Sequence, residues 1–324
     1  MKDFLFVNGN STKPSLNLAQ EEFLLKNKTE YFISLWQNEP SVIIGTSQNA
    51  LSEVDFDYAN ANGINVVRRI TGGGAVYHDF GNVCYTVIGP YEEGVNYFHK
   101  FSAPVIEYLK TLGLNAEFSG RNDLLVDGKK FSGTAETVYK NRIMHHGTIL
   151  FDSDLSVLSR VLKPNPLKLK SKGIKSVKSR VANVKEFLDS NITTKQFING
   201  LTTFFKDYCK EYVLTENELL AIKTLAKEKY ETYEWNVAYS PKGQFSITIP
   251  FASGIITFSF DIHNGQICNP EFFGDFFTLN NLEELKRQMI GKRLTKQDLV
   301  SAFYNISEYI LGLDTEIVVS ALLK

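Results

Sequence analysis

The alternation of apolar and polar positions divides the first half of the chain into short strands and longer helices. Runs rich in β-branched and aromatic residues predict strands at 31–36, 41–45, 65–69 and 82–89. Apolar positions three to four residues apart predict helices at 17–27 and 97–112. Several of these strands are joined by connections too short for a crossover helix, so we expect mainly antiparallel pairing.

The middle of the chain continues this pattern. Residues 123–136 predict a β-hairpin, because Asp127-Gly128 supplies the positive φ angles that a tight turn requires. Residues 142–151 predict the next strand. Helical spacing returns at 154–162 and across 193–230.

A second change of pattern predicts a second domain. Residues 243–267 return to single alternation with tight turns, which places a domain boundary near 236–242. Helices are expected around 281–290 and 295–311. We therefore expect an α+β protein, in which residues 1–238 form a larger domain on a mixed, largely antiparallel sheet and residues 239–324 form a small α+β domain.

The composition excludes several classes of protein. A formal net charge of -1 gives no overall attraction to nucleic acid or to an anionic membrane, so neither is expected as a partner. The three cysteines are odd in number and lack CxxC spacing, which fits a reducing compartment and makes a zinc site unexpected. No apolar run approaches the roughly 20 residues that span a bilayer, and the N-terminus is too short and polar for a signal peptide, so we expect a cytoplasmic protein.

The segment RRITGGGAVYHDFGN, residues 68–82, concentrates groups that bind anions. Three adjacent glycines cost backbone entropy in a strand or helix, which indicates that something approaches this backbone closely. Their N–H groups can form a concave anion site, and Arg68 and Arg69 add forked donors for phosphate oxygens. His78 and Asp79 offer either acid–base groups or structural hydrogen bonds at a strand end. From these residues alone, a glycine-rich hairpin with surface arginines is an equal alternative, since neither the GxGxxG nor the Walker A spacing is present.

Two further segments carry polar groups near strand ends. In GRNDLLVDGKKFSGTAE, residues 120–136, strand alternation directs Lys129 and Lys130 to opposite faces, so one of them can enter a cleft. Such a lysine can neutralise charge on a phosphoryl or acyl oxygen, and Asp123 can hold a metal ion that bridges phosphates. A solvated, charged turn is the structural alternative. The same alternation directs the two histidines of MHHGTILFD to opposite faces of their strand.

A basic segment follows. Residues 155–185 contain nine Lys or Arg and no acid, and the centre of this stretch, 170–184, is rich in small residues without helical periodicity. The composition predicts a mobile basic loop, which fits a nucleic-acid contact, a solvated linker or a lid over an anionic ligand. The near-neutral net charge and the lack of interleaved aromatic residues count against nucleic acid.

Taken together in this order, RRITGGGAVYHDFGN, GRNDLLVDGKKFSGTAE, MHHGTILFDSDL and KGIKSVKSRVANV resemble the lipoate-protein ligase family closely. The resemblance covers about residues 20–190, and the C-terminal stretch is similar to that family's small accessory domain. It implies a catalytic domain of the biotin-protein ligase and class II synthetase type. It also implies an enzyme that activates lipoate with ATP as lipoyl-adenylate, releases pyrophosphate, and passes the acyl group to a lysine of a lipoyl domain.

The resemblance also assigns site residues by position. The nucleotide would contact Arg69, Gly74, Ala75, Val76, Tyr77 and Lys130. The lipoyl group would contact Arg68, Thr71, Gly73, His78, Lys130 and His146. Lys130 is the expected catalytic residue, Asp123 the expected Mg²⁺ ligand, and the loop at 170–184 the expected lid over the adenylate. The implied partners are ATP with Mg²⁺, lipoate with octanoate as a second acid, and apo lipoyl domains of 2-oxoacid dehydrogenase E2 subunits or the glycine cleavage H protein.

Other activities compete with this interpretation. An acyltransferase of the same fold would move octanoyl or lipoyl groups between carrier proteins without ATP, through a cysteine thioester, and Cys84 is the cysteine near the motifs. Cys84 lies in an apolar strand without flanking basic groups, which is typical of an inert thiol. A non-catalytic lipoyl-binding protein would not need Lys130 and the glycine loop, and a biotin ligase would carry a different glycine motif. We therefore expect an ATP-dependent, AMP-forming lipoate-protein ligase.

Overall fold

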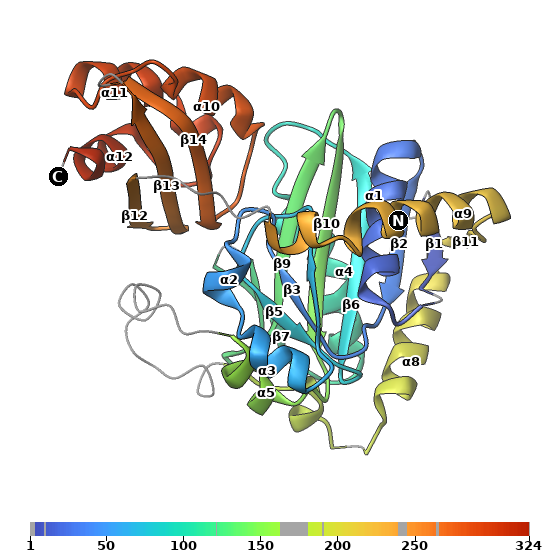
Figure 1. Ribbon diagram of the computed structural model, residues 1–324. Coiled ribbons are helices and arrows are strands. Elements are labelled where there is room, and N and C mark those ends of the chain that lie inside the picture. The colour runs from blue at the N-terminus through green and yellow to red at the C-terminus, as the bar shows by residue number, and fades with distance from the viewer. Residues whose placement is uncertain are drawn as a thin grey trace.

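The computed structural model describes residues 4–9, 11–120, 122–162, 181–189, 191–238, 245–263 and 266–323. Of the expected lid at 170–184, residues 170–180 lie outside these ranges. Figure 1 shows a larger N-terminal domain, coloured blue to yellow, and a smaller C-terminal domain beside it in orange and red. Within the described ranges, no helix combines the length and the apolar character needed to cross a bilayer.

Two sheets form the framework of the N-terminal domain. The larger sheet has the strand order β11-β1-β2-β6-β10-β9-β8-β7. Its strands are β1 (Phe4–Asn8), β2 (Tyr31–Trp36), β6 (Asn82–Pro90), β7 (Ala116–Ser119), β8 (Asp123–Val126), β9 (Lys129–Tyr139), β10 (Arg142–Leu150) and β11 (Lys210–Glu211). The smaller sheet has the order β4-β3-β5 and consists of β3 (Ser41–Ile44), β4 (Asn65–Arg68) and β5 (Val76–His78). Strand β1 runs parallel to both of its neighbours and the other pairs of the larger sheet are antiparallel, so this sheet is mixed.

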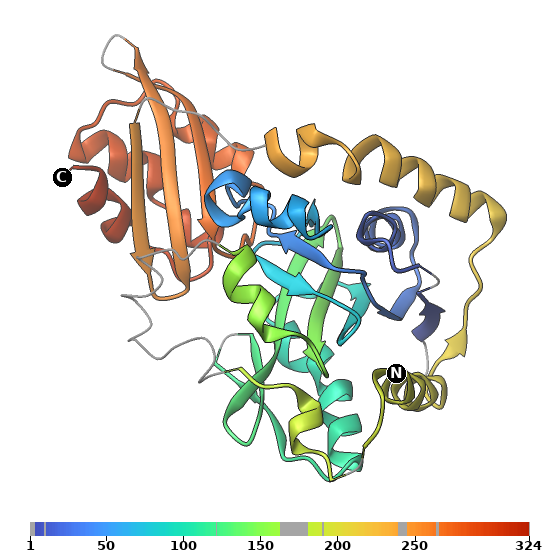
Figure 2. The same cartoon turned by 60° about the horizontal axis from the view of Figure 1, so that its bottom comes forward.

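Helices cover both faces of the larger sheet. The helices and helical turns of this domain are α1 (Pro14–Asn27), α2 (Ala50–Glu53), α3 (Phe56–Ala61), α4 (Tyr97–Thr111), α5 (Leu155–Val161), the 3-10 turn η1 (Val184–Phe187), α8 (Thr194–Lys206), α9 (Glu216–Leu225) and the π-helical turns η2 (Ala226–Tyr230) and η3 (Glu234–Ala238). Of these, α2, α3 and α5 pack with the smaller sheet. Figure 2 shows α1 and α9 on one side of the sheet and α4 and α8 on the other. Because both faces are covered, β6 is buried along almost its whole length.

Strand β6 separates two hydrophobic cores by simple alternation. Val83, Tyr85 and Val87 pack in the core that contains residues of α4 and α8. Cys84 and Ile88 pack in the core that contains residues of α1, α9 and the smaller sheet. A polar side chain on this second face therefore lies between the two sheets, where it can line a cavity rather than meet solvent.

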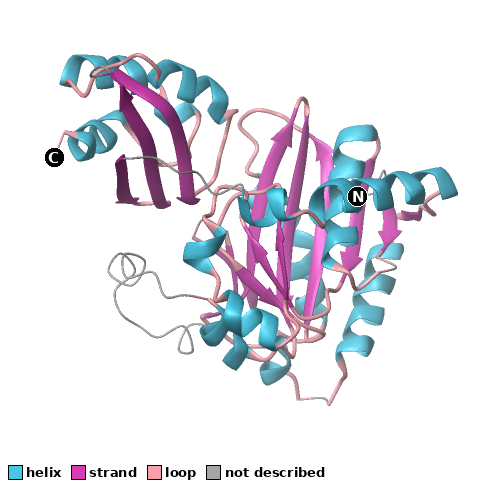
Figure 3. Cartoon of the chain, viewed as in Figure 1, coloured by secondary structure: helices cyan, strands magenta, loops and turns pink. Residues whose placement is uncertain are grey.

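The C-terminal domain is a three-stranded antiparallel sheet with helices on one face (Figure 3). Its elements are β12 (Phe245–Phe251), β13 (Gly254–His263), β14 (Gln266–Asp275), α10 (Leu282–Met289), α11 (Lys296–Phe303), the 3-10 turn η4 (Ile306–Glu308) and α12 (Thr315–Leu322). A separate apolar core joins these strands and helices. The segment after β14 touches the N-terminal domain, where the Phe277 and Phe98 rings meet edge to face with centroids 5.5 Å apart.

The structure confirms the predicted α+β class and the mixed, largely antiparallel sheet. It also confirms the predicted hairpin, since Asp127 and Gly128 have φ angles of 48° and 76°. Strands β3 and β4 of the smaller sheet agree with the strands predicted at 41–45 and 65–69, whereas β5 and helices α2 and α3 were not predicted, because their segments are too short to show a clear period. The expected helix at 295–311 ends at Phe303, and the expected helix at 193–230 is divided by β11. The boundary between residues 238 and 239 stays a prediction.

Candidate functional site

Two cavities meet at Lys130, between the larger and the smaller sheet. Their volumes are about 220 Å³ and about 360 Å³. The residues that line both are Ala75, Val76, Asp123, Lys130, Gly133 and Thr148. Ligands in the two cavities would therefore touch next to the Lys130 ammonium group. A larger hollow of about 910 Å³, between the end of the β9–β10 hairpin and the C-terminal domain, contains none of the predicted site residues.

The first cavity, of about 220 Å³, runs from an exposed end to a buried end. At one end the side chains of Lys130 and Asp123 are 35% and 40% exposed. At the other end, Trp36 and Cys84 belong to the buried core. The apolar lining consists of Leu18, Trp36, Ile43, Ala75, Val76, Cys84, Ala135 and Phe277. Such a cavity suits a hydrocarbon chain whose polar head lies at Lys130.

Arg69 shapes the glycine loop at 72–74. Its guanidinium group donates to Thr71 Oγ1 at 2.9 Å, Ile43 O at 3.0 Å, Gly72 O at 2.6 Å and Gly74 O at 2.9 Å. These bonds use four of its five N–H donors. Burial lowers the pKa of Arg69 to about 10, so the group remains charged at neutral pH. The positive charge of Arg69 therefore lies next to the glycine loop, and the hydrogen bonds to Thr71, Gly72 and Gly74 fix the conformation of the loop.

The C-terminal domain reaches into the same site. Gly73 has a φ of 91°, and its N–H donates to Phe276 O at 3.1 Å. Asp275 and Phe277, on either side of Phe276, line the first cavity. One donor of the anion-binding loop predicted for the three glycines is thus occupied by the C-terminal domain. No local sequence pattern pointed to these residues, because they belong to another domain.

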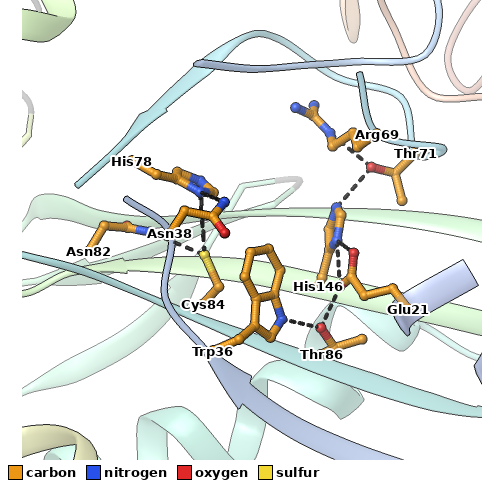
Figure 4. A network of polar contacts seen from close by, with 10 residues as sticks. All are labelled: Glu21, Trp36, Asn38, Arg69, Thr71, His78, Asn82, Cys84, Thr86 and His146. Atoms are coloured by element: carbon orange, nitrogen blue, oxygen red, sulfur yellow. Dashed lines mark hydrogen bonds and ion pairs between the residues drawn. The ribbon is translucent and has the colours of Figure 1, made fainter. Parts of the chain in front are cut away.

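A buried carboxylate that sequence reasoning missed anchors one wall of the first cavity (Figure 4). Glu21 of α1 accepts hydrogen bonds from His146 Nδ1, at 3.0 Å, and from the Thr86 hydroxyl. His146 Nε2 contacts Thr71 Oγ1 at 2.8 Å, and Trp36 Nε1 donates to Thr86 Oγ1 at 2.8 Å. Glu21 thereby fixes His146 and Trp36, which both line the cavity. The sequence did contain a signal for Glu21, because this acidic residue occupies the apolar face of the helix predicted at 17–27.

His78 and Cys84 lie at the buried end of this cavity. Burial lowers the pKa of His78 to about 3, so the ring is neutral at physiological pH. Burial also raises the pKa of the Cys84 thiol well above its usual value. Asp79 accepts hydrogen bonds from the backbone N–H groups of Gly81 and Asp154, which is the structural alternative considered for it. A neutral ring beside a protonated thiol is poorly suited to nucleophilic catalysis.

Lys130 and Lys129 point to opposite faces of β9, as the alternation predicted. Lys129 is exposed. Lys130 lines both cavities, and its Nζ lies 2.5 Å from Asp123 Oδ1. The Lys130 carbonyl accepts a hydrogen bond from Ala182 N at 3.0 Å. The C-terminal end of the basic segment, described from residue 181 onward, therefore pairs with β9 beside this lysine.

The second cavity, of about 360 Å³, has mostly apolar walls. Its further lining consists of Tyr77, Leu125, Gly128, Ser132, Leu150, Ser153, Leu155, Leu158 and Val181. Walls of this kind suit the flat ring of a base. Of the predicted nucleotide contacts, Ala75, Val76, Tyr77 and Lys130 line this cavity, whereas Arg69 and Gly74 line the first one.

The predicted lipoyl contacts divide into two groups. Gly73, His78, Lys130 and His146 line the first cavity. Thr71 is buried behind it, and Arg68 is buried among backbone carbonyl groups and lines neither cavity. Asp123, the predicted Mg²⁺ ligand, lines both cavities. The described part of the chain has no group of three or more His, Cys, Asp or Glu side chains that could hold a metal ion by itself.

Both parts of the chain are similar to known proteins. Residues 13–206 match the model of the lipoyl protein ligase A/B catalytic domain, and residues 240–322 match that of the bacterial lipoate protein ligase C-terminus. Lipoate–protein ligase 1 of Staphylococcus aureus is 40% identical over 93% of this chain and 96% of its own. LipL1 of P. falciparum, solved in complex with lipoate, is 27% identical, with a TM-score of 0.82 over 99% of each chain. A lipoate-protein ligase A bound with ATP is 30% identical, with a TM-score of 0.62 over 72% of this chain and 97% of that one.

The matching family models cover most of both domains, and the identity to a curated relative extends over nearly the whole of both chains. The chain belongs to the lipoate-protein ligase family.

Proposed function

We propose that the protein activates lipoate with ATP and transfers the lipoyl group to the acceptor lysine of a lipoyl domain. The observation that carries this proposal is that two cavities meet at Lys130, of which the first extends from this lysine to a buried end at Trp36 and Cys84. An acyl chain in the first and a nucleotide in the second would bring a carboxylate and an α-phosphate together beside one ammonium group. The ATP-bound structure of a relative supports the choice of nucleotide.

In the first half-reaction, a lipoate carboxylate oxygen attacks the α-phosphorus of ATP. The bond from this phosphorus to the bridging oxygen breaks, and pyrophosphate leaves with the electron pair. Lys130 would hold the carboxylate and the α-phosphate in line and offset the negative charge that accumulates between them. The nucleophile comes from the substrate, so the enzyme requires no nucleophilic Ser or Cys.

In the second half-reaction, the amine of the acceptor lysine attacks the carbonyl carbon of lipoyl-AMP. The bond to the AMP oxygen breaks, AMP leaves, and the nitrogen loses a proton as the amide forms. Lys130 would now stabilise the charge on the carbonyl oxygen. The same ammonium group therefore serves both steps, because the acyl carbon stays at the junction of the two cavities.

Asp123 is the residue that would hold Mg²⁺. Its carboxylate lies where the two cavities join, and Mg²⁺ is commonly bound by one or two carboxylates together with substrate phosphates. The ion, when bound, would reduce the negative charge of the phosphates.

One experiment tests this proposal directly. The protein is incubated with ATP and lipoate, with and without an apo lipoyl domain, while pyrophosphate release and lipoylation are followed separately. Pyrophosphate release without the acceptor, and lipoylation only with it, are the expected results. Lipoylation without ATP would contradict the proposal.

Cys84→Ser tests the transferase alternative. Because the buried thiol is protonated, we expect the variant to keep the kcat for pyrophosphate release, and burial of a hydroxyl would cost about 1–3 kcal/mol of stability or lipoate affinity. The kcat, the KM for lipoate and the melting temperature are measured together. A folded but inactive variant, with an acyl thioester on the wild-type cysteine detected by mass spectrometry, would instead support the transferase.

Glu21→Gln tests the carboxylate behind the cavity wall. Both partners of Glu21 donate to it, and His146 Nδ1 lies 3.0 Å from Oε1 and 3.1 Å from Oε2, so glutamine replaces one of these acceptors with an NH₂ donor and removes the carboxylate charge. We expect the KM for lipoate to rise about tenfold and the free energy of unfolding to fall by about 1–3 kcal/mol.

Glu22→Gln is the matched control. Glu22 follows Glu21 on α1 and is equally buried, but its partners are Lys26, Lys229 and Tyr230, and none of these lines the first cavity. We expect a similar loss of stability with an unchanged KM for lipoate. Equal KM values in the two variants would show that Glu21 acts on stability alone.

A further inference from the structure

His78 has no task in the proposed chemistry, although it lines the acyl cavity. Its side chain is 2% exposed, and its low pKa keeps the ring neutral. The ring lies 6.1 Å from that of Trp36, between centroids, and next to the Cys84 sulfur. A neutral histidine carries one N–H donor and one acceptor nitrogen, so its tautomer decides which of them it offers to a ligand.

Two backbone carbonyl groups fix this tautomer through a chain of amides. Asn17 Nδ2 donates to Ser11 O at 3.1 Å and to Gln37 O at 2.8 Å, and carbonyl oxygens can only accept. The same Nδ2, whose two hydrogens serve three oxygens, lies 2.9 Å from the Asn38 amide. An Asn38 nitrogen at this position would face a nitrogen that cannot accept, so the facing atom is Asn38 Oδ1 and Asn38 Nδ2 faces His78. Asn38 Nδ2 is a donor and lies 3.0 Å from His78 Nδ1. Nδ1 must therefore accept, and the proton is on Nε2.

The Nε2–H group is buried without a strong acceptor. Its partner among the described residues is the Cys84 sulfur at 3.9 Å, while Asn82 Nδ2 already donates to that sulfur at 3.1 Å (Figure 4). A sulfur atom is a weak acceptor, and this distance is long. A buried donor in this state costs free energy until a ligand atom satisfies it.

We propose that His78 selects the sulfur-bearing ring of lipoate over the methyl end of octanoate, by donating its Nε2–H to a dithiolane sulfur at the buried end of the cavity. This inference rests on the proposed function, which places the carboxylate at Lys130 and the far end of the chain beside His78. Trp36 adds a favourable contact between the sulfur and its aromatic ring. Asn17 and Asn38 act as positioning residues, because they determine which ring nitrogen carries the proton.

The preference for lipoate arises mainly because the binding of octanoate carries a free-energy cost. Both acids fill the apolar part of the cavity, so burial of the chain separates them little. A methyl end leaves the Nε2–H group desolvated and unsatisfied, whereas a dithiolane sulfur accepts its hydrogen bond. The preference for lipoate is therefore expected to depend on this donor and not on the ring shape of His78.

His78→Phe and His78→Gln form a matched pair for the test. Phenylalanine keeps a flat ring without the donor, and glutamine keeps an amide N–H at similar reach. Lipoate and octanoate are titrated calorimetrically into each protein without ATP. We expect the ratio of the two affinities to fall roughly tenfold in His78→Phe and to stay within about twofold of wild type in His78→Gln.

Nitrogen-15 spectra of histidine-labelled wild-type protein provide a second readout, for which one folded variant is sufficient to assign the His78 signals. The His78 signals, assigned by their absence in His78→Gln or His78→Phe, should show the Nε2–H tautomer and should shift with lipoate more than with octanoate. An Nδ1–H tautomer, equal shifts, or an unchanged ratio in a folded His78→Phe would overturn the inference. Loss of pyrophosphate release with these binding results intact would overturn only the proposed function.

Discussion

Replacing Lys130 by alanine is expected to slow both half-reactions by about 10²- to 10³-fold, the range typical for loss of one group that stabilises transition-state charge. Its ammonium lies where the two cavities join, so in the proposed reaction it would face the α-phosphate in the first step and the acyl oxygen in the second. Pyrophosphate release from ATP and lipoate measures the first step. Transfer from chemically prepared lipoyl-AMP to an apo lipoyl domain measures the second.

The fold should survive this change. The Lys130–Asp123 pair is partly exposed, and such pairs contribute about 0–1 kcal/mol to stability. Lys129→Ala is the matched control, because this lysine precedes Lys130 in β9 but is exposed on the other face. We expect it to retain wild-type rates. A Lys130→Ala protein that keeps either rate near wild type would remove Lys130 from that step.

Local rules were sufficient where the structure depends on neighbours in sequence. The turn at Asp127 and Gly128 follows from their tolerance of positive φ, and the opposite directions of Lys129 and Lys130 follow from the period of a strand. The same period places His145 and His146 on opposite faces, where His146 lines the cavity and His145 packs against Tyr85. These residues could be placed relative to one another before any tertiary contact was known.

The rest of the site depends on contacts between distant segments. Glu21 meets His146 across 125 positions, and Asn38 meets His78 across 40. Asp275 and Phe277 come from another domain. A local pattern carries no information about such pairs, because the pairing is decided by which strands become neighbours in the sheets. Sequence reasoning therefore identified the glycine loop and the lysine, but missed the groups that hold the cavity walls.

Arg68 and Arg69 show the same limit within one dipeptide. Both were predicted to contact a ligand, and alternation alone indicates only that they point in different directions. Arg69 lines the first cavity, whereas Arg68 is fully buried on the side of the turn η3. The sequence did not indicate that Arg68 is buried. A buried guanidinium group is stable only where carbonyl groups surround it, and the sequence does not show which carbonyl groups will lie nearby.

Arg68→Met is expected to lower the free energy of unfolding by about 3–5 kcal/mol, among the largest effects of a single substitution. The guanidinium donates to the carbonyls of Gly45, Thr46, Gln48, Trp235 and Asn236. It thereby ties the loop after β3 and the turn η3 to strand β4. Methionine fills a similar volume but leaves these buried acceptors without their charged donor, and each such loss is costly. Urea unfolding measures the effect.

Arg160→Met separates this structural role from a general effect of losing an arginine. Arg160 is exposed near the end of α5, so its replacement should change stability by no more than about 0.5 kcal/mol. Lipoate titration of the folded Arg68→Met fraction, below its melting temperature, distinguishes the alternatives. If Arg68 only joins the loop after β3 to the turn η3, the affinity for lipoate should fall much less than the free energy of unfolding. Wild-type stability with a large loss of lipoate affinity would mean that Arg68 contacts the ligand, as the family resemblance implies, in a conformation where its carbonyl partners have been released.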